Sequence, residues 1–193
     1  MSNLEHKNVV KLYYAFENES YYFIVMELMK GGTLERFIKH RYSDSSNNFF
    51  MTDSECSEIM KGLLKGVDYL HSYDITHRDL KPENVMFEIP NDLTSIKIGD
   101  FGISNINEYR STQYCGTYIY MSPEEIKRKP YTDSVDTWAL GIIMYIMGSG
   151  GAHPIYRANM TKKEYEDKIN KLEVEGWNFN DEFPMYIQTG LII

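Results

Sequence analysis

Apolar and polar residues alternate near the start of the chain in the pattern of a β-strand. Over residues 10–16 every second side chain is strongly apolar, which predicts a half-buried strand. The polar residues 17–20 separate this segment from the apolar run 21–28, which predicts a second and more buried strand. Because the connection is short, we expect the two strands to pair as a hairpin.

The next segments follow the spacing of helices. A pair of glycines interrupts the apolar run, and Thr33 is placed to cap a short helix with apolar residues on one face. Thr52 and Glu55 form a capping-box pattern. Apolar residues at helical spacing over 56–70 then predict a longer helix that packs against a core.

A further helix is expected at the centre of the fold. It begins near Asp133, its residues 135–146 are apolar nearly all round, and it ends at Gly148. A capping box at Thr161 and Glu164 predicts a charged surface helix after it. The segment 75–102, by contrast, has the pattern of short strands and turns, with a hairpin between 85–87 and 96–98. This order of elements predicts an α+β fold rather than a doubly wound parallel sheet.

Composition narrows the classes of function. The chain has 193 residues, 42% of them hydrophobic, and a formal net charge of −8. Such a chain can bury a core, and its acidic balance argues against a nucleic-acid partner, which requires a basic face. No segment has the length of a membrane span or the pattern of a signal peptide, so we expect no membrane association. The two cysteines indicate a reduced intracellular chain. Without a targeting signal we expect a cytoplasmic location, which could extend to the nucleus.

Two short segments contain the residues that indicate a catalytic function. Residues 77–84 read His-Arg-Asp-Leu-Lys-Pro-Glu-Asn, and Asp100-Phe-Gly102 begins 16 positions after Asn84. The hairpin expected between them would bring the segments side by side. Together they supply a carboxylate that could accept a proton, and a carboxylate and an amide oxygen suited to Mg²⁺. Phosphoryl transfer requires little more from a protein than a metal, positioning and a proton acceptor.

These motifs, in this order, resemble the signature of the eukaryotic protein kinases. Lys81 is the form found in serine/threonine kinases, and segment 21–29 and Trp177-Asn-Phe179 are most similar to the calcium/calmodulin-dependent group. The resemblance implies a protein-kinase-like fold with a mainly helical C-lobe, a hinge and a partial N-lobe β-hairpin. Residues 1–29 would be a remnant of the N-lobe and hinge, and residues 30–193 a C-lobe that is incomplete at its end.

The resemblance also implies catalytic roles. Asp79 would orient the hydroxyl of a serine or threonine in a protein substrate and accept its proton. Lys81 would neutralise charge on the transferring γ-phosphoryl group of ATP. Asn84 and Asp100 would hold Mg²⁺.

For the nucleotide, Met26 matches the gatekeeper position, while Glu27 and Met29 match the hinge whose backbone meets adenine. Met86 matches the floor beneath the adenine ring, and Thr33 lies where contacts to the ribose fall. These five residues are the expected ATP-binding set.

Other positions match the activation segment. Thr117 would help to fix the 77–84 loop and to select serine or threonine substrates. Glu124 matches an acid that is buried against an arginine in the family, and Asp136 would brace the backbone near Arg78.

Arg78 itself resembles the arginine that meets a phosphate on the activation loop. The usual acceptor position is occupied by Gln113, so Ser111 and Thr112 are the nearby candidates for a regulatory phosphate, out of register with the family.

Three parts of a complete kinase site cannot be placed in the chain: the glycine-rich loop, the phosphate-pairing lysine and the glutamate that orients it. We therefore expect the isolated chain to have negligible turnover. The alternative function is a catalytically inactive, kinase-like binding or scaffold module. Calmodulin is a candidate regulatory partner by group resemblance alone.

Overall fold

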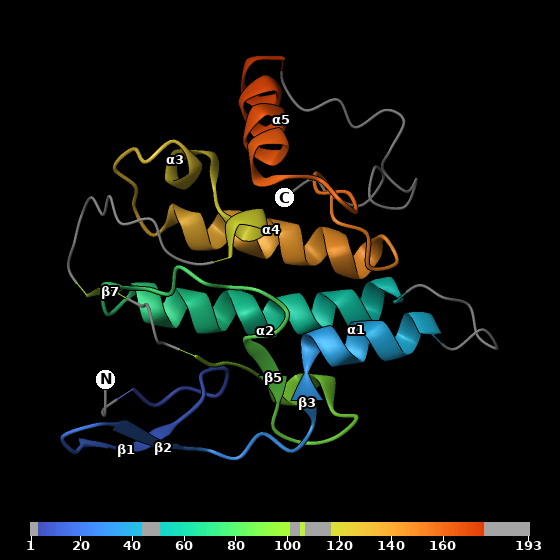
Figure 1. The fold of residues 1–193 in the computed structure, drawn as a ribbon. Helices are drawn as coiled ribbons and strands as arrows, with labels where there is room; N and C mark the ends of the chain where they lie inside the picture. Colours follow the sequence, from blue (N-terminus) through green and yellow to red (C-terminus); the bar gives the residue numbers. More distant parts are fainter. Residues whose placement is uncertain (1–3, 44–50, 101–104, 107–116, 176–193) are drawn as a thin grey trace.

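The computed structural model describes residues 4–43, 51–100, 105–106 and 117–175, and the fold is reported for these residues. Its helices and small antiparallel sheets confirm the α+β class (Figure 1). The helices form the larger part, and the N-terminal hairpin lies at one end of the molecule. Short strands lie between the hairpin and the helices.

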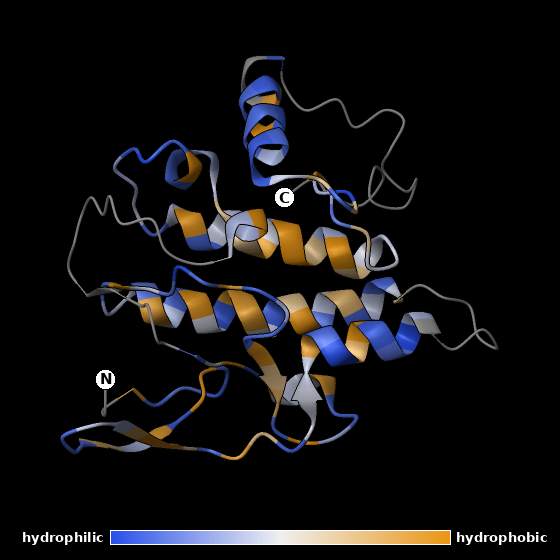
Figure 2. Cartoon of the chain, viewed as in Figure 1, coloured by the Kyte–Doolittle hydropathy of each residue, from blue (hydrophilic) through white to orange (hydrophobic). Residues whose placement is uncertain are grey.

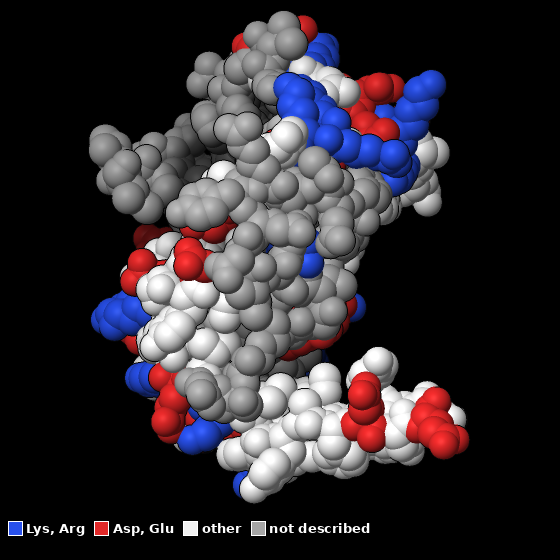
Figure 3. All heavy atoms as spheres, turned by 90° about the vertical axis from the view of Figure 1, so that its left-hand side faces the viewer, with Lys and Arg blue, Asp and Glu red and all other residues white. Residues whose placement is uncertain are grey.

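The N-terminal hairpin is confirmed as an antiparallel pair. Its strands are β1 (Leu12–Glu17) and β2 (Tyr22–Met26), with Leu12 opposite Met26 and Glu17 opposite Tyr22. The expected burial is wrong, however, because every residue of β2 is exposed. A two-stranded ribbon has no second layer of its own, and its apolar side chains stay in solvent wherever no other element covers them. Figure 3 shows the hairpin projecting from the rest of the molecule as a mostly uncharged arm.

A second sheet joins the hairpin to the helices. It has the order β3 (Gly32–Thr33), β5 (Val85–Phe87) and β6 (Ile96–Ile98), with the short helix η1 (Leu93–Ser95) before β6. The β5–β6 hairpin was predicted, whereas β3 was not. Gly31 explains how β3 can approach β5, because a Cβ at this position would lie 2.5 Å from the Cβ of Phe87. A third sheet pairs β4 (Ile75–Thr76) with β7 (Asn105–Ile106).

The predicted helices form close to their expected bounds. Thr33 accepts a hydrogen bond from the Arg36 N–H at the start of α1, and the capping boxes of Thr52 and Thr161 both close. The helices are α1 (Leu34–Ser43), α2 (Asp53–His71), α3 (Pro123–Ile126), α4 (Ser134–Gly148) and α5 (Lys162–Glu175), with the short helix η2 (Tyr118–Tyr120) before α3. The sequence did not predict α3.

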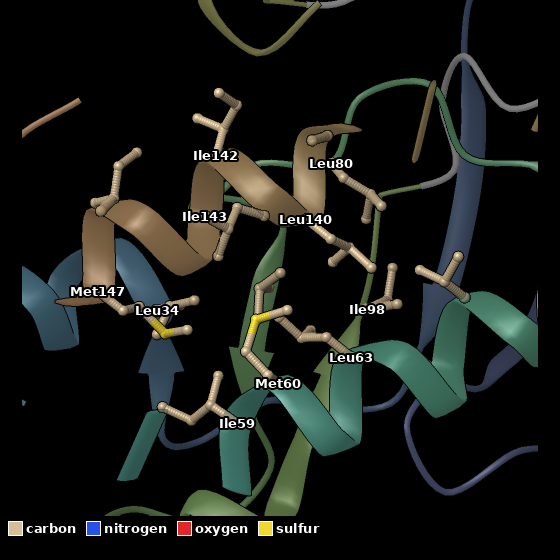
Figure 4. Packing of buried hydrophobic residues seen from close by; sticks show 14 of the residues in the cluster. Leu34, Ile59, Met60, Leu63, Leu80, Ile98, Leu140, Ile142, Ile143 and Met147 are labelled. Carbon is tan, nitrogen blue, oxygen red and sulfur yellow. The ribbon is translucent and has the colours of Figure 1, made fainter. Parts of the chain in front are cut away.

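The core lies between α2 and α4, with α1 and the β5–β6 hairpin closing its sides (Figure 1). Figure 4 shows side chains of α2 facing those of α4, with Leu34 and Ile98 at the edges. Leu63 and Ile143 are fully buried there. Figure 2 shows α4 to be apolar along most of its length, as expected for a central helix, whereas α1 and α5 are largely polar. Within the described ranges, no helix is both long and apolar enough to cross a membrane.

Candidate active site

The side chain of Asp79 in the 77–84 loop is held by several hydrogen bonds. Its Oδ1 accepts a hydrogen bond from the Thr117 N–H at 3.0 Å, and its Oδ2 accepts one from Lys81 Nζ at 2.7 Å and one from Asn84 Nδ2 at 3.0 Å. Only 13% of the side chain is exposed. Both carboxylate oxygens are therefore held in one orientation.

Lys81 connects this carboxylate to a distant part of the chain. Its Nζ lies 2.9 Å from Thr117 Oγ1 as well as 2.7 Å from Asp79 Oδ2. Thr117 Oγ1 is in turn 3.3 Å from Asp79 Oδ1. The ammonium group thus neutralises the carboxylate and fixes the threonine hydroxyl beside it.

Asn84 and Asp100 have the chemistry of Mg²⁺ ligands. The amide nitrogen of Asn84 donates to the Asp79 carbonyl at 2.8 Å and to its carboxylate, so Oδ1 is the Asn84 side-chain atom that could bind a cation. The Gly99 N–H donates to the Asn84 carbonyl at 2.9 Å, which places Asp100 on the adjoining backbone. Asp100 is exposed, with φ of 58°.

This pair of oxygen donors fits Mg²⁺, which retains waters and also binds substrate phosphates. The described part of the chain holds no cluster of three or more His, Cys, Asp or Glu side chains that would suit a metal bound by protein alone.

A buried carboxylate on α4 binds the backbone of the 77–84 loop. Asp136 is 1% exposed and accepts hydrogen bonds from the His77 N–H at 2.8 Å and the Arg78 N–H at 2.9 Å. Arg78 has φ of 68°, in the left-handed region that is unfavourable for a residue with a side chain. The two amide hydrogen bonds to Asp136 hold the loop in this conformation. This is the place where sequence analysis expected a brace.

His71, which the sequence analysis did not single out, belongs to the same group. Its Nε2 lies 2.8 Å from Asp136 Oδ2, and its Nδ1 lies 3.6 Å from Asp133. Burial acts to lower the pKa of His71, but the hydrogen bond and charge of Asp136, together with Asp133 and Asp68, raise it above the usual value. The signal in the sequence is its position at the end of the predicted helix 56–70, and this signal does not reveal its partner.

The expected ATP-binding residues lie along the connection between the hairpin and the β3–β5–β6 sheet. Thr33 on β3 and Met86 on β5 are opposite each other in the sheet register. Met26 ends β2, Glu27 follows it, and Met29 is partly buried just before β3. The backbone here is fixed by hydrogen bonds from the Glu27 N–H to the Lys11 carbonyl and from the Gly31 N–H to the Phe87 carbonyl.

Glu27 also makes an ion pair that sequence analysis missed. Lys97 on β6 is 9% exposed, and its Nζ lies 2.7 Å and 2.8 Å from the two carboxylate oxygens of Glu27 and 3.0 Å from Glu88. Burial acts to raise the pKa of Glu27, but hydrogen bonds from Lys97 and from the Lys11 N–H keep it below its usual value. The signal available was a charged residue in the otherwise apolar strand Ile96-Lys97-Ile98.

The activation-segment predictions have mixed outcomes. Thr117 lies beside Asp79, as already described, whereas Ser111 and Thr112 fall outside the described residues. The expected buried acid at Glu124 is wrong, because Glu124 is only partly buried and Glu125 is the buried residue, at 5% exposure. The reason is a third capping box, in which Ser122 caps α3 and Glu125 folds back onto it. This pattern was visible in the sequence, as it was at Thr52 and Thr161.

Comparison with known proteins identifies the family of the chain. The protein kinase domain family matches residues 1–189. Serine/threonine-protein kinase H1 of Homo sapiens is 39% identical over 155 residues, covering 78% of this chain and 35% of that protein. Its homologue in Danio rerio is 40% identical over 154 residues, with the same coverage. A calcium/calmodulin-dependent protein kinase type 1 of Macrobrachium nipponense is 34% identical over 160 residues, covering 82% of this chain and 44% of that protein.

The chain therefore belongs to the protein kinase domain family. The relatives named above, which are 34–40% identical over the aligned residues, are named as serine/threonine and calcium/calmodulin-dependent protein kinases. The chain spans about a third to less than half of the length of these relatives.

Proposed function

We propose that this chain carries the phosphoryl-transfer residues of a serine/threonine protein kinase. The observation that supports the proposal most strongly is the environment of Asp79, whose two oxygens are held by Lys81, Asn84 and Thr117. A carboxylate fixed in this way can orient a substrate hydroxyl with little reorganisation, which is how a protein accelerates phosphoryl transfer.

Each residue of the group then has a separate task. Asp79 would accept the hydrogen bond of the substrate hydroxyl and take up its proton during phosphoryl transfer, with ADP as the leaving group. Lys81 lies beside this carboxylate, where its positive charge would meet the negative charge of the phosphoryl group. Thr117 presents its hydroxyl at the same place and would contact a serine or threonine substrate.

The cofactors are Mg²⁺ and ATP, held by different parts of the site. Asn84 and Asp100 would supply the protein oxygens for Mg²⁺. The connection from Met26 to Met29, together with Thr33 and Met86, would hold the adenosine part of ATP. When bound, Mg·ATP supplies the γ-phosphoryl group and neutralises the charge that develops during its transfer.

The test is transfer of radiolabelled phosphate to a protein substrate by the natural gene product and by the 193-residue chain alone. Asp79→Asn should lower transfer by the natural product by about 10²- to 10⁴-fold, the usual contribution of a general base. Asp167→Asn, which removes an exposed carboxylate from α5, is the matched control and should have no effect. Equal activity of the Asp79→Asn variant and the unchanged protein would refute the proposal. We expect negligible transfer by the 193-residue chain alone.

A non-catalytic binding module is the second candidate, and the exposed apolar side chains of the hairpin favour it. Tyr14, Tyr22 and Ile24 are each more than half exposed, at 70%, 84% and 56%. No phosphate transfer by the natural gene product, combined with stable capture of a partner protein that Tyr22→Ser abolishes, would support this candidate. Because one relative is named as calmodulin-dependent, calmodulin is the first regulatory partner to test.

A further inference from the structure

The capping box of α3 is unusual because it is buried. Ser122 is fully buried, and Glu125 is 5% exposed. Glu125 Oε2 accepts hydrogen bonds from the Ser122 N–H at 2.9 Å and from the Ser122 hydroxyl at 3.0 Å. Its other oxygen, Oε1, is buried and has no hydrogen-bond partner among the residues that the structure describes. A buried, unpaired carboxylate oxygen is costly when the group is ionised.

The Glu125 side chain faces the support of the 77–84 loop. It lines a small cavity together with Asp136 and Val135 of α4 and with Arg78 and Asp79 of the loop. The charged or titratable groups around Glu125 are those of Glu124, Asp136, Arg78, Asp79 and Tyr120. Helix α5 also contacts α3, but none of the residues that line the cavity comes from α5.

The balance of charges around Glu125 favours a proton. Glu125 forms no ion pair within the described part of the chain, while the carboxylates of Asp136 and Glu124 oppose its ionisation. Burial, as the largest effect, raises the pKa of Glu125 to about 7, although hydrogen bonds from Ser122 act in the opposite direction. Both protonation states are therefore accessible near neutral pH.

We propose that Glu125 is a proton-dependent positioning residue, whose neutral carboxyl group keeps α3 packed against Asp136 and thereby holds the 77–84 loop. Loss of its proton to solvent places a second negative charge in the interior beside Asp136. This repulsion acts on the carboxylate that binds the amide N–H groups of His77 and Arg78. Since Arg78 depends on Asp136 to stay at its unfavourable φ, the loop is the part that should respond.

The proposal rests on the proposed function only in giving the 77–84 loop a catalytic role, and its test uses neither ATP nor turnover. Hydrogen exchange of the His77 and Arg78 amides is followed by NMR between pH 5.5 and 8.5 in the 193-residue chain, with rates corrected for intrinsic exchange. In the unchanged chain, protection of these amides should fall by about tenfold or more as the pH rises through 7. In Glu125→Gln, which keeps the shape of the side chain without the titration, protection should stay constant.

Glu164→Gln is the matched control, because Glu164 closes the same capping box with Thr161 at an exposed site. This variant should behave as the unchanged chain does. Amides of β5 and β6 report opening of the whole fold and should lose less protection than the two loop amides. Equal loss at β5, β6 and the loop would overturn the positioning role, as would the same pH dependence in Glu125→Gln and the unchanged chain.

A second measurement applies even if Glu125→Gln fails to fold. The ¹³C shift of the Glu125 carboxyl group, followed in the unchanged chain, gives its titration directly. A midpoint near neutral pH supports the proposal, and a midpoint near 4.5, the ordinary value for glutamate, overturns it.

Discussion

The N-terminal hairpin and the helical part both contain apolar segments, but these are exposed in the hairpin and buried in the helical part. In the helical part, α2 and α4 face each other, and residues such as Leu63 and Ile143 are completely removed from solvent. In the hairpin, Phe23, Ile24 and Val25 remain 39%, 56% and 42% exposed although they belong to a continuous apolar strand. Apolar side chains therefore stabilise a fold only where a second layer covers them.

The largest expected effect on stability comes from shortening one buried side chain, and the comparison is the same change at an exposed position. Leu63→Ala should lower the free energy of unfolding by about 3 kcal/mol, because it leaves a cavity between α2 and α4. Ile24→Ala should lower the free energy of unfolding by less than about 0.5 kcal/mol, because Ile24 is already 56% exposed and buries little apolar surface. Urea denaturation of both variants measures the difference. Similar losses would mean that another part of the chain covers the hairpin in solution.

A smaller effect is expected at the junction of the two regions. Lys97→Met leaves the half-buried carboxylate of Glu27 without its cation and should cost about 1–2 kcal/mol. Glu88→Gln removes the more exposed partner and should cost less than about 0.5 kcal/mol. The double variant Lys97→Met/Glu27→Met should regain most of the loss, since it removes both buried charges. Additive losses in this cycle would show that the ion pair does not join the regions.

The smallest expected effect concerns the pH dependence of the helical part. The pKa of His71 is raised in the folded chain, so its contribution to stability is complete below its unfolded pKa and is lost as the pH rises through the folded value. His71→Gln should remove this part of the pH dependence and cost about 1 kcal/mol at low pH, by loss of the hydrogen bond to Asp136. Thermal unfolding of both proteins across pH 5.5–8.5 is the measurement. A profile unchanged in His71→Gln would assign the dependence to other groups.

Much of the fold could be predicted because its signals are local. The capping boxes of Thr52 and Thr161 and the apolar residues of α4 each describe one element and do not depend on the rest of the chain. The exposure of β2 could not be predicted in this way. The apolar sequence of a strand indicates that it could be buried, but it does not identify the element that would pack against it.

The same distinction between local and long-range signals applies to the residues of the site. Asp79, Asn84 and Asp100 stand in short motifs, and their neighbourhood followed from the predicted β5–β6 hairpin. The missed contacts join residues far apart in sequence, such as Glu27 with Lys97 and His71 with Asp136. A charged residue in a buried strand indicates that a partner exists, but only the folded chain identifies it.

The support of the 77–84 loop by Asp136 has a consequence for the order of folding. The amides of His77 and Arg78 bond to a carboxylate 59 and 58 positions further along the chain. Contacts of such long range close large loops and tend to form after local ones. We therefore expect the loop to reach its final conformation only after α4 has docked on α2, which pulse-labelled exchange during refolding would detect as late protection of these two amides. The 77–84 loop, which contains the proposed catalytic residues, would then be among the last parts of the chain to fold.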